Sequence, residues 1–170
     1  MAEKSDLRTS AKEIRKNLNM KKISEKLVSL LRSKEYYKSA QNIMIFFPTS
    51  YEVDVTSLLN DDKVFYLPVV SGKNLKVCPY KKGDKLELSK LNIYEPTTAE
   101  ISVAKLDLVV VPSLMVDKEN YRLGYGGGFY DRFLNDNPHI VSVTLIPNDL
   151  ITEKLPHDAW DIKLNYVISI

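Results

Sequence analysis

The chain has 170 residues, of which 44% are hydrophobic and 27% charged, with a single cysteine and a formal net charge of +2. This composition is typical of a water-soluble globular protein, and one cysteine excludes an internal disulfide. It contains no run of about 20 apolar residues such as a membrane helix needs, and no apolar leader at its start. We therefore expect one domain over residues 1–170, in the cytoplasm.

The N-terminal part of the chain carries most of the positive charge. Residues 1–40 contain 11 Lys and Arg against 5 Asp and Glu. Apolar residues recur at helical spacing over 6–18, which predicts an amphipathic helix, and a second helix follows over about 21–32. A basic stripe lies beside the apolar one, formed by Lys4, Arg8, Lys12 and Arg15. Such a stripe is most often the solvated face of a helix, but it can also bind an anion.

The middle and C-terminal parts alternate between strand and helix patterns. Expected strands are 43–47, 64–67, 106–111, 140–145 and 166–170, with short helices near 51–60 and 127–135. Residues 74–88 carry two alternating runs around KKGD, which predicts a hairpin turning at Gly83, and 91–105 is expected to be a surface connection. The pattern predicts an α/β fold with a mainly parallel central sheet, helices on both faces, a β-hairpin insertion and two N-terminal helices.

The segment Arg122–Arg132, RLGYGGGFYDR, holds four of the six glycines in the chain. Glycine allows positive φ and close approach of the backbone, and the start of the following helix offers free N–H groups, so the segment predicts a phosphate cradle. Arg122 and Arg132 bracket it and could bind the same anion. The alternative is a tight turn that only packs a strand against a helix.

Asp131 lies in the first turn of the helix that follows the glycines. A carboxylate there is favoured by the helix dipole, and beside a phosphate it could also bind Mg²⁺. Asp117, Asp158 and Asp161 are candidate second ligands, and sequence spacing does not choose among them. The two histidines and Cys78 show no spacing typical of a catalytic triad or a metal site.

The run VVVPSLMVDKENYRLGYGGGFYDRFL resembles the signature of the 5-formyltetrahydrofolate cyclo-ligase family. The resemblance extends along the chain: Lys4 and Arg8 are similar to the family's N-terminal KxxxR, and FPTSYEVD, LPVV, YEP and LPHDAWD recur in family order. It implies an α/β enzyme that uses ATP and Mg²⁺ to convert 5-formyltetrahydrofolate to 5,10-methenyltetrahydrofolate, releasing ADP and phosphate. The formyl oxygen would be phosphorylated and N10 would then attack the carbon.

The resemblance also implies residue roles. Lys4, Arg8 and Arg122 would be catalytic, and Asp131 and Asp161 would bind Mg²⁺. ATP would be bound by Lys4, Arg8, Arg122, Leu123, Gly124, Tyr125, Gly126, Gly127, Gly128, Phe129 and Tyr130. The folate, with or without a polyglutamate tail, would be bound by Phe47, Glu52, Tyr125, Gly126, Gly127, Gly128 and Phe129. We expect a monomer that binds neither nucleic acid nor membrane.

The chain departs from the family pattern at three positions. Val69 stands where a basic residue is expected, Asn165 where an acidic one is, and Gly127 where some members have lysine. Val69 and Asn165 leave open a related Mg-ATP enzyme with another pterin substrate, while the loop glycine is a common variant. A module that binds nucleotide or nucleic acid through its basic helices, without catalysis, is the alternative from a different class.

Overall fold

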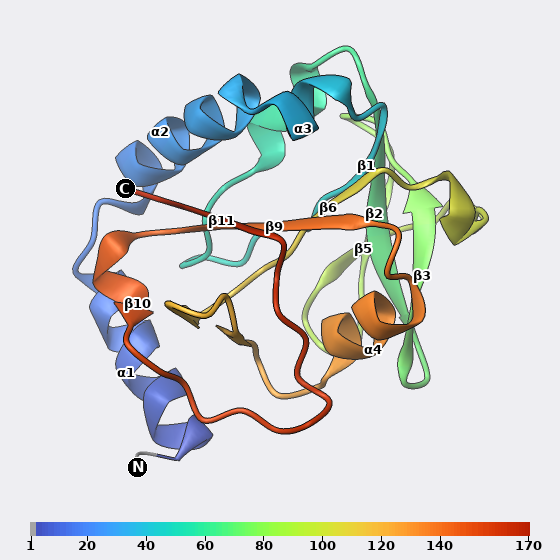
Figure 1. The fold of residues 1–170 in the computed structure, drawn as a ribbon. Coiled ribbons are helices and arrows are strands. Elements are labelled where there is room, and N and C mark those ends of the chain that lie inside the picture. The colour runs from blue at the N-terminus through green and yellow to red at the C-terminus, as the bar shows by residue number, and fades with distance from the viewer. Residues whose placement is uncertain (1–2) are drawn as a thin grey trace.

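Six strands form the central sheet of the computed structural model, which describes residues 3–170 (Figure 1). In spatial order they are β11 (Tyr166–Ser169), β9 (Val141–Ile146), β6 (Leu108–Val110), β1 (Asn42–Met44), β2 (Val64–Ser71) and β3 (Asn74–Pro79). Neighbouring strands are parallel except β2 and β3, which are antiparallel. The predicted mainly parallel α/β sheet is therefore confirmed.

Alternating side chains of the sheet build a core on each face. Ile43 and Leu108 face a core that includes residues of α2 (Met20–Ser33), α3 (Glu35–Ser39) and the 3-10 turn η1 (Thr56–Asn60). Met44 and Val109, the next residues along the same strands, face a core with α4 (Phe129–Asp136). Figure 1 shows α2 and α3 on one side of the sheet and α4 on the other, as predicted.

The first helix, α1 (Lys4–Lys16), packs against a second sheet that the sequence patterns did not predict. This sheet contains β10 (Ile151–Thr152), β7 (Met115–Asp117) and β8 (Arg122–Leu123), and the turn η3 (Asn148–Leu150) lies beside α1. Ala11 of α1 is fully buried in this third cluster with Val116 and Leu123. Strands of two or three residues are too short for periodicity to reveal.

The prediction of a hairpin over 74–88 is wrong, because the two strands in this segment do not pair with each other. β3 instead pairs with β2 across the two-residue loop at Gly72 and Lys73, where Gly72 has φ +61°. β4 (Leu86–Leu88) pairs with β5 (Tyr94–Pro96), so part of the expected surface connection is a strand, followed by the turn η2 (Val103–Lys105). The turn at Gly83 exists, with φ +94°, but it links strands of two different sheets.

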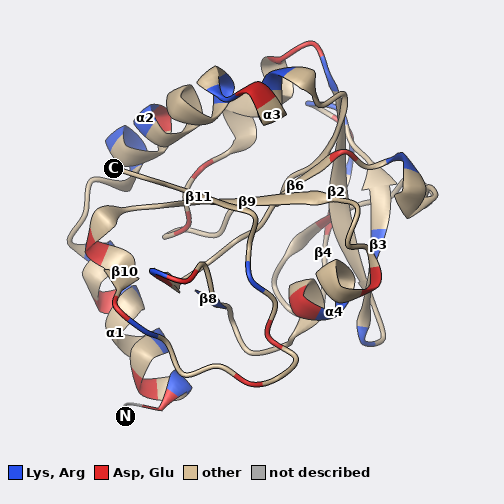
Figure 2. Cartoon of the chain, viewed as in Figure 1, with Lys and Arg blue, Asp and Glu red and all other residues tan. Residues whose placement is uncertain are grey.

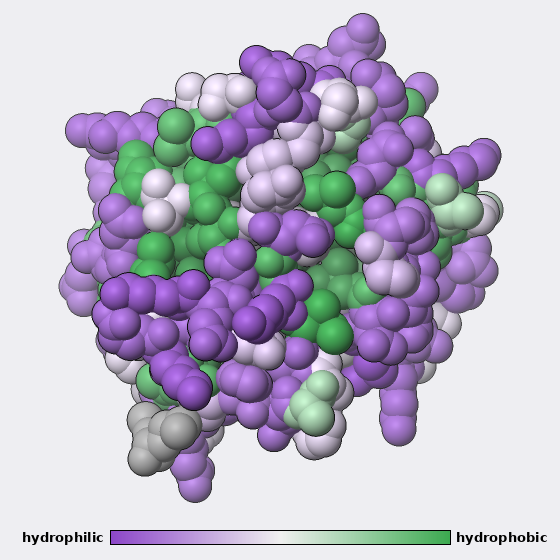
Figure 3. Space-filling view, in the orientation of Figure 1, coloured by the Kyte–Doolittle hydropathy of each residue, from purple (hydrophilic) through white to green (hydrophobic). Residues whose placement is uncertain are grey.

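The charged stripe of α1 is only partly a solvated face. Figure 2 shows basic and acidic positions along α1 and α2. Figure 3, in the same orientation, shows hydrophilic side chains surrounding apolar ones on this face of the molecule. Arg15, expected on the basic stripe, is only 1% exposed, and its guanidinium donates to the carbonyls of Tyr51, Ser113 and Leu114. Within residues 3–170, no helix has the length and apolar character needed to cross a membrane.

Candidate functional site

A cavity of about 560 Å³ lies where several segments distant in sequence meet. Its walls come from the start of α1, the loop after β1, strand β2, the β4–β5 hairpin, the C-terminal loop, and residues 124–128, which we call the glycine loop. All the site residues that the family resemblance implies line it: Lys4, Arg8, Phe47, Glu52, Arg122, Leu123, Gly124, Tyr125, Gly126, Gly127, Gly128, Phe129, Tyr130, Asp131 and Asp161. The fold thus gathers these residues, while their roles stay predictions.

The glycine loop is held by side chains that lie close against its backbone. Arg8 Nε donates to the Gly124 carbonyl over 2.8 Å, which ties α1 to the loop. Gly126 has φ +106°, and a Cβ there would lie 3.4 Å from Arg8 Cζ. At Gly124, a Cβ would lie 2.5 Å from Arg122 Nη1. The N-terminal helix therefore reaches the glycines across more than a hundred residues of sequence.

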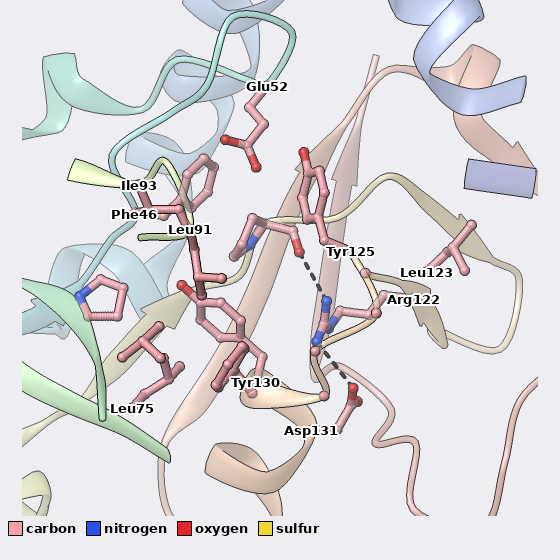
Figure 4. A pocket seen from close by; sticks show the side chains of 18 of the residues that line it. Phe46, Glu52, Leu75, Leu91, Ile93, Arg122, Leu123, Tyr125, Tyr130 and Asp131 are labelled. Atoms are coloured by element: carbon pink, nitrogen blue, oxygen red, sulfur yellow. Dashed lines mark hydrogen bonds and ion pairs between the residues drawn. The ribbon is translucent and has the colours of Figure 1, made fainter. Parts of the chain in front are cut away.

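Arg122 is a buried cation with an unused donor. Its side chain is 5% exposed, with Nη1 donating to the Pro112 carbonyl and Nη2 3.2 Å from Asp131 Oδ2 (Figure 4). Its Nε is buried and has no hydrogen-bond partner among the described residues. Burial lowers the pKa of this guanidinium, which the Asp131 carboxylate opposes. A desolvated guanidinium beside a cavity favours an anionic ligand.

Arg132, which the sequence placed on the other side of the same anion site, does not line the cavity. It donates instead to the carbonyls of Lys73 and Gly127 over 2.8 Å each. These bonds hold the glycine loop against the β2–β3 turn. Of the two arginines expected to bracket the anion, only Arg122 lines the cavity, and Arg132 holds the loop from outside it.

The acidic side of the cavity lies between α1 and the C-terminal loop. Lys4 Nζ is 2.7 Å from both Asp158 Oδ2 and Asp161 Oδ2. Burial disfavours the charge on Lys4, but these two hydrogen bonds outweigh it and raise its pKa. Burial likewise opposes the charge on Asp161, and the bonds from Lys4 and the Asp158 amide nevertheless lower its pKa. Asp131, Asp158 and Asp161 all line the cavity.

Asp117, one of the candidate metal ligands, lies elsewhere. It is 2% exposed and accepts from the amides of Glu119, Tyr121 and Leu155 at 2.9 to 3.0 Å. These bonds close the β7–β8 turn and attach the C-terminal loop to it. Asp117 is thus a structural residue, and the choice of second ligand narrows to Asp158 and Asp161.

The other half of the cavity is apolar, and the sequence patterns did not reveal most of it. Its lining includes Phe46, Pro68, Val70, Leu75, Leu91, Ile93 and Tyr94. Figure 4 shows several of these opposite Tyr130, with Glu52 and Tyr125 facing each other at the upper end. Burial and the Glu52 carboxylate raise the pKa of the Tyr125 hydroxyl. Trp160, 70% exposed, lies at the rim.

The positions that depart from the family pattern do not line the cavity, apart from Gly127. Pro68 and Val70 point toward it, so Val69 between them lies on the opposite side of β2. Asn165 accepts from the Ser142 amide and hydroxyl at 2.8 and 3.0 Å, which joins the C-terminal strand to β9. Neither residue supplies a group to the site.

Comparison with known proteins gives consistent matches along the chain. The profile of the 5-formyltetrahydrofolate cyclo-ligase family matches residues 1–169. The chain is 32% identical over 142 residues to the 5-formyltetrahydrofolate cyclo-ligase of Escherichia coli K12, covering 76% of this chain and 78% of that protein. It is 27% identical over 180 residues to the Haemophilus influenzae protein of the same name, covering 95% and 94%.

Solved structures agree with the fold. The NMR structure of the Aquifex aeolicus 5,10-methenyltetrahydrofolate synthetase has a TM-score of 0.83 at 30% identity, covering 98% of this chain and 89% of that one. A Mycoplasma pneumoniae 5,10-methenyltetrahydrofolate synthetase has a TM-score of 0.74 at 22% identity, covering 98% of each chain. The second match supports the fold alone.

Proposed function

The chain belongs to the 5-formyltetrahydrofolate cyclo-ligase family, and we propose that it converts 5-formyltetrahydrofolate to 5,10-methenyltetrahydrofolate at the cost of one ATP. The observation that carries the proposal is the meeting of Lys4 and Arg8 with the glycine loop in a cavity whose other half is apolar. A charged end and an apolar end in one cavity suit a nucleotide phosphate placed beside a largely planar organic substrate.

We assign the ATP phosphates to the charged end. The unpaired Nε of Arg122 and the lack of room for a Cβ at Gly124 are features that a phosphate cradle explains. The start of α4, capped by Gly128 at φ +66°, adds free backbone N–H groups at the same end. Lys4 and Arg8 would neutralise the transferred phosphoryl group.

The residues present also fit a magnesium ion. Mg²⁺ in phosphoryl-transfer sites takes one or two carboxylates together with phosphate oxygens and water. Asp131 and Asp161 line the charged end and would supply those carboxylates, each now held by a cationic partner, Arg122 and Lys4. When bound, the ion would neutralise charge on the phosphates. The described residues include no group of three or more His, Cys, Asp or Glu that could hold a metal by itself, so phosphate oxygens and water would have to complete the coordination.

The chemistry asks for alignment and charge neutralisation, not for a covalent nucleophile. The formyl oxygen attacks the γ-phosphorus and ADP leaves, which converts a poor leaving group into a phosphate ester. N10 then attacks the formyl carbon and loses its proton, and phosphate departs with the former formyl oxygen. Arg122, Lys4 and Arg8 would stabilise the charge on the transferred group in the first step.

We assign the folate to the apolar end. Phe47 packs edge-on against Tyr94 with ring centroids 5.6 Å apart, and both line the cavity with Leu91. Apolar and aromatic walls of this kind bury a ring system. The alternative of another pterin substrate depended on Val69 and Asn165, and neither of these residues lines the cavity. A non-catalytic binding module has no support from the comparisons, because the matched relatives are named as ligases.

The proposal is tested with purified protein, 5-formyltetrahydrofolate, ATP and Mg²⁺, following the methenyl product by absorbance and ADP by a coupled assay. Both products are expected, and omitting ATP or Mg²⁺ should stop the reaction. Arg8→Met should raise KM for ATP about 10- to 100-fold through loss of a charged contact, while Lys12→Met, on the exposed side of the same helix, should not. No methenyl product from the wild type, or equal behaviour of the two variants, would overturn it.

A further inference from the structure

The apolar end of the cavity contains an acidic side chain that the proposed reaction does not use. Glu95 lies on β5, and it lines the cavity together with Ile93, which comes just before that strand. Val70, also in the lining, donates its backbone N–H to Glu95 Oε1 over 2.9 Å. A partly buried carboxylate among apolar side chains needs hydrogen-bond donors to be stable there.

The contacts of Glu95 within the protein leave much of its accepting capacity free. A carboxylate has about four acceptor positions, and the Val70 amide fills one. Glu95 takes part in none of the ion pairs formed by the described residues. Its cross-strand neighbour Glu87 differs from it, because Glu87 is exposed to solvent and forms an ion pair with Lys85 Nζ at 3.1 Å.

We propose that Glu95 is a specificity-determining residue that accepts hydrogen bonds from the pterin ring, at its 2-amino group and N3–H. This inference rests on the proposed function, because that function brings a 2-amino-4-oxopteridine to this end of the cavity. The two donors are adjacent and parallel, which is the arrangement a carboxylate binds with both oxygens. The Val70 amide fixes one oxygen and so orients the acid before the ligand arrives. A ligand lacking the 2-amino group leaves an acceptor of Glu95 unpaired and binds more weakly.

The competing explanation is structural: Glu95 would only anchor the β4–β5 hairpin to β2 through the Val70 amide. Glu95→Gln separates the two roles. Glutamine keeps an oxygen that can accept from Val70 N–H, but its amide presents N–H groups where the ring also has donors. A structural role therefore survives the substitution, whereas recognition of the ring does not. Glu87→Gln, on the opposite strand of the same hairpin, is the matched control.

The experiment measures, by isothermal titration calorimetry, the Kd of 5-formyltetrahydrofolate and of its 2-desamino analogue for wild type, Glu95→Gln and Glu87→Gln. Wild type and Glu87→Gln should prefer the 2-amino compound by about 10- to 100-fold, and Glu95→Gln should bind the two within about threefold of each other. Equal binding of the two ligands by wild type, or an unchanged preference in Glu95→Gln, would overturn the role of Glu95.

The same proteins are assayed for turnover, which distinguishes failure of this inference from failure of the proposed function. A wild type that turns over 5-formyltetrahydrofolate but does not discriminate between the ligands rejects Glu95 alone. A wild type that binds neither compound rejects both proposals. Thermal melting of each variant checks that Glu95→Gln remains folded, which the retained Val70 contact predicts.

Discussion

Replacing Gly126 with alanine tests whether the backbone of the glycine loop is part of the site. Gly126 has φ +106°, and the added Cβ would lie 3.4 Å from Arg8 Cζ. An L-residue at such φ costs roughly 1–2 kcal/mol. The loop can avoid that cost by rotating toward negative φ, which would turn an amide away from the phosphate. Losing one hydrogen bond to a charged group corresponds to about a 10- to 100-fold fall in kcat/KM for ATP.

Gly83→Ala is the matched control, because Gly83 also has positive φ, +94°, but a Cβ there meets nothing within 4 Å. Gly83→Ala should lose roughly 1–2 kcal/mol of unfolding free energy, or about 2–8 °C of melting temperature for a chain of this size, and Gly126→Ala should lose no more than that. Only Gly126→Ala should lose activity in the methenyl assay. Equal kcat/KM in the two variants would refute the reasoning that the loop's backbone cradles a ligand.

Three further predictions follow from the contacts around the site. The pKa of Asp161 is lower in the folded protein than its ordinary value of 3.8, so the carboxylate stabilises the fold fully above pH 3.8 and loses this effect as the pH falls through its pKa in the folded protein. Denaturation curves measured from pH 6 down to pH 3 should therefore show the stabilities of wild type and Asp161→Asn converging. Arg15→Met should lower the unfolding free energy by about 2–5 kcal/mol, because the substitution leaves buried carbonyls without a donor. The control Lys12→Met, at an exposed position, should lower it by about 0.5 kcal/mol or less, and urea titrations measure both values. Tyr125→Phe should raise KM for the folate and leave KM for ATP unchanged in steady-state kinetics, since the Tyr125 hydroxyl faces Glu52. A change in KM for ATP alone would contradict the assignment of this hydroxyl to the folate end of the cavity.

The main sheet was predictable because its central strands, such as β6 and β9, are buried on both faces and read as apolar runs. The run over 106–111 is the clearest case, and it forms the buried strand β6 at 108–110. The prediction of a hairpin at Gly83 was wrong for a physical reason. The turn does form there, but the residues of a turn do not determine which sheet each flanking strand joins. The pairing of β3 with β2 buries Val77 and Cys78 in the sheet.

The charged half of the site was predictable because its residues are concentrated in one segment and one helix. The glycine loop is a local signal, and the resemblance to the family selected Lys4 and Arg8 from the basic stripe of α1. The apolar half was not, since β2, β3 and the β4–β5 hairpin supply it one or two residues at a time. Burial of Arg15 was also hidden, because its carbonyl partners come from loops that only the fold brings together.

The central claim, that ATP activates the formyl group by phosphorylating its oxygen, is tested most directly by isotope transfer. 5-Formyltetrahydrofolate carrying ¹⁸O in the formyl group is converted by the purified protein with ATP and Mg²⁺ in ordinary water, and the released phosphate is analysed by mass spectrometry. The mechanism predicts that each phosphate formed with a methenyl product carries the label. Methenyl product accompanied by unlabelled phosphate would contradict it.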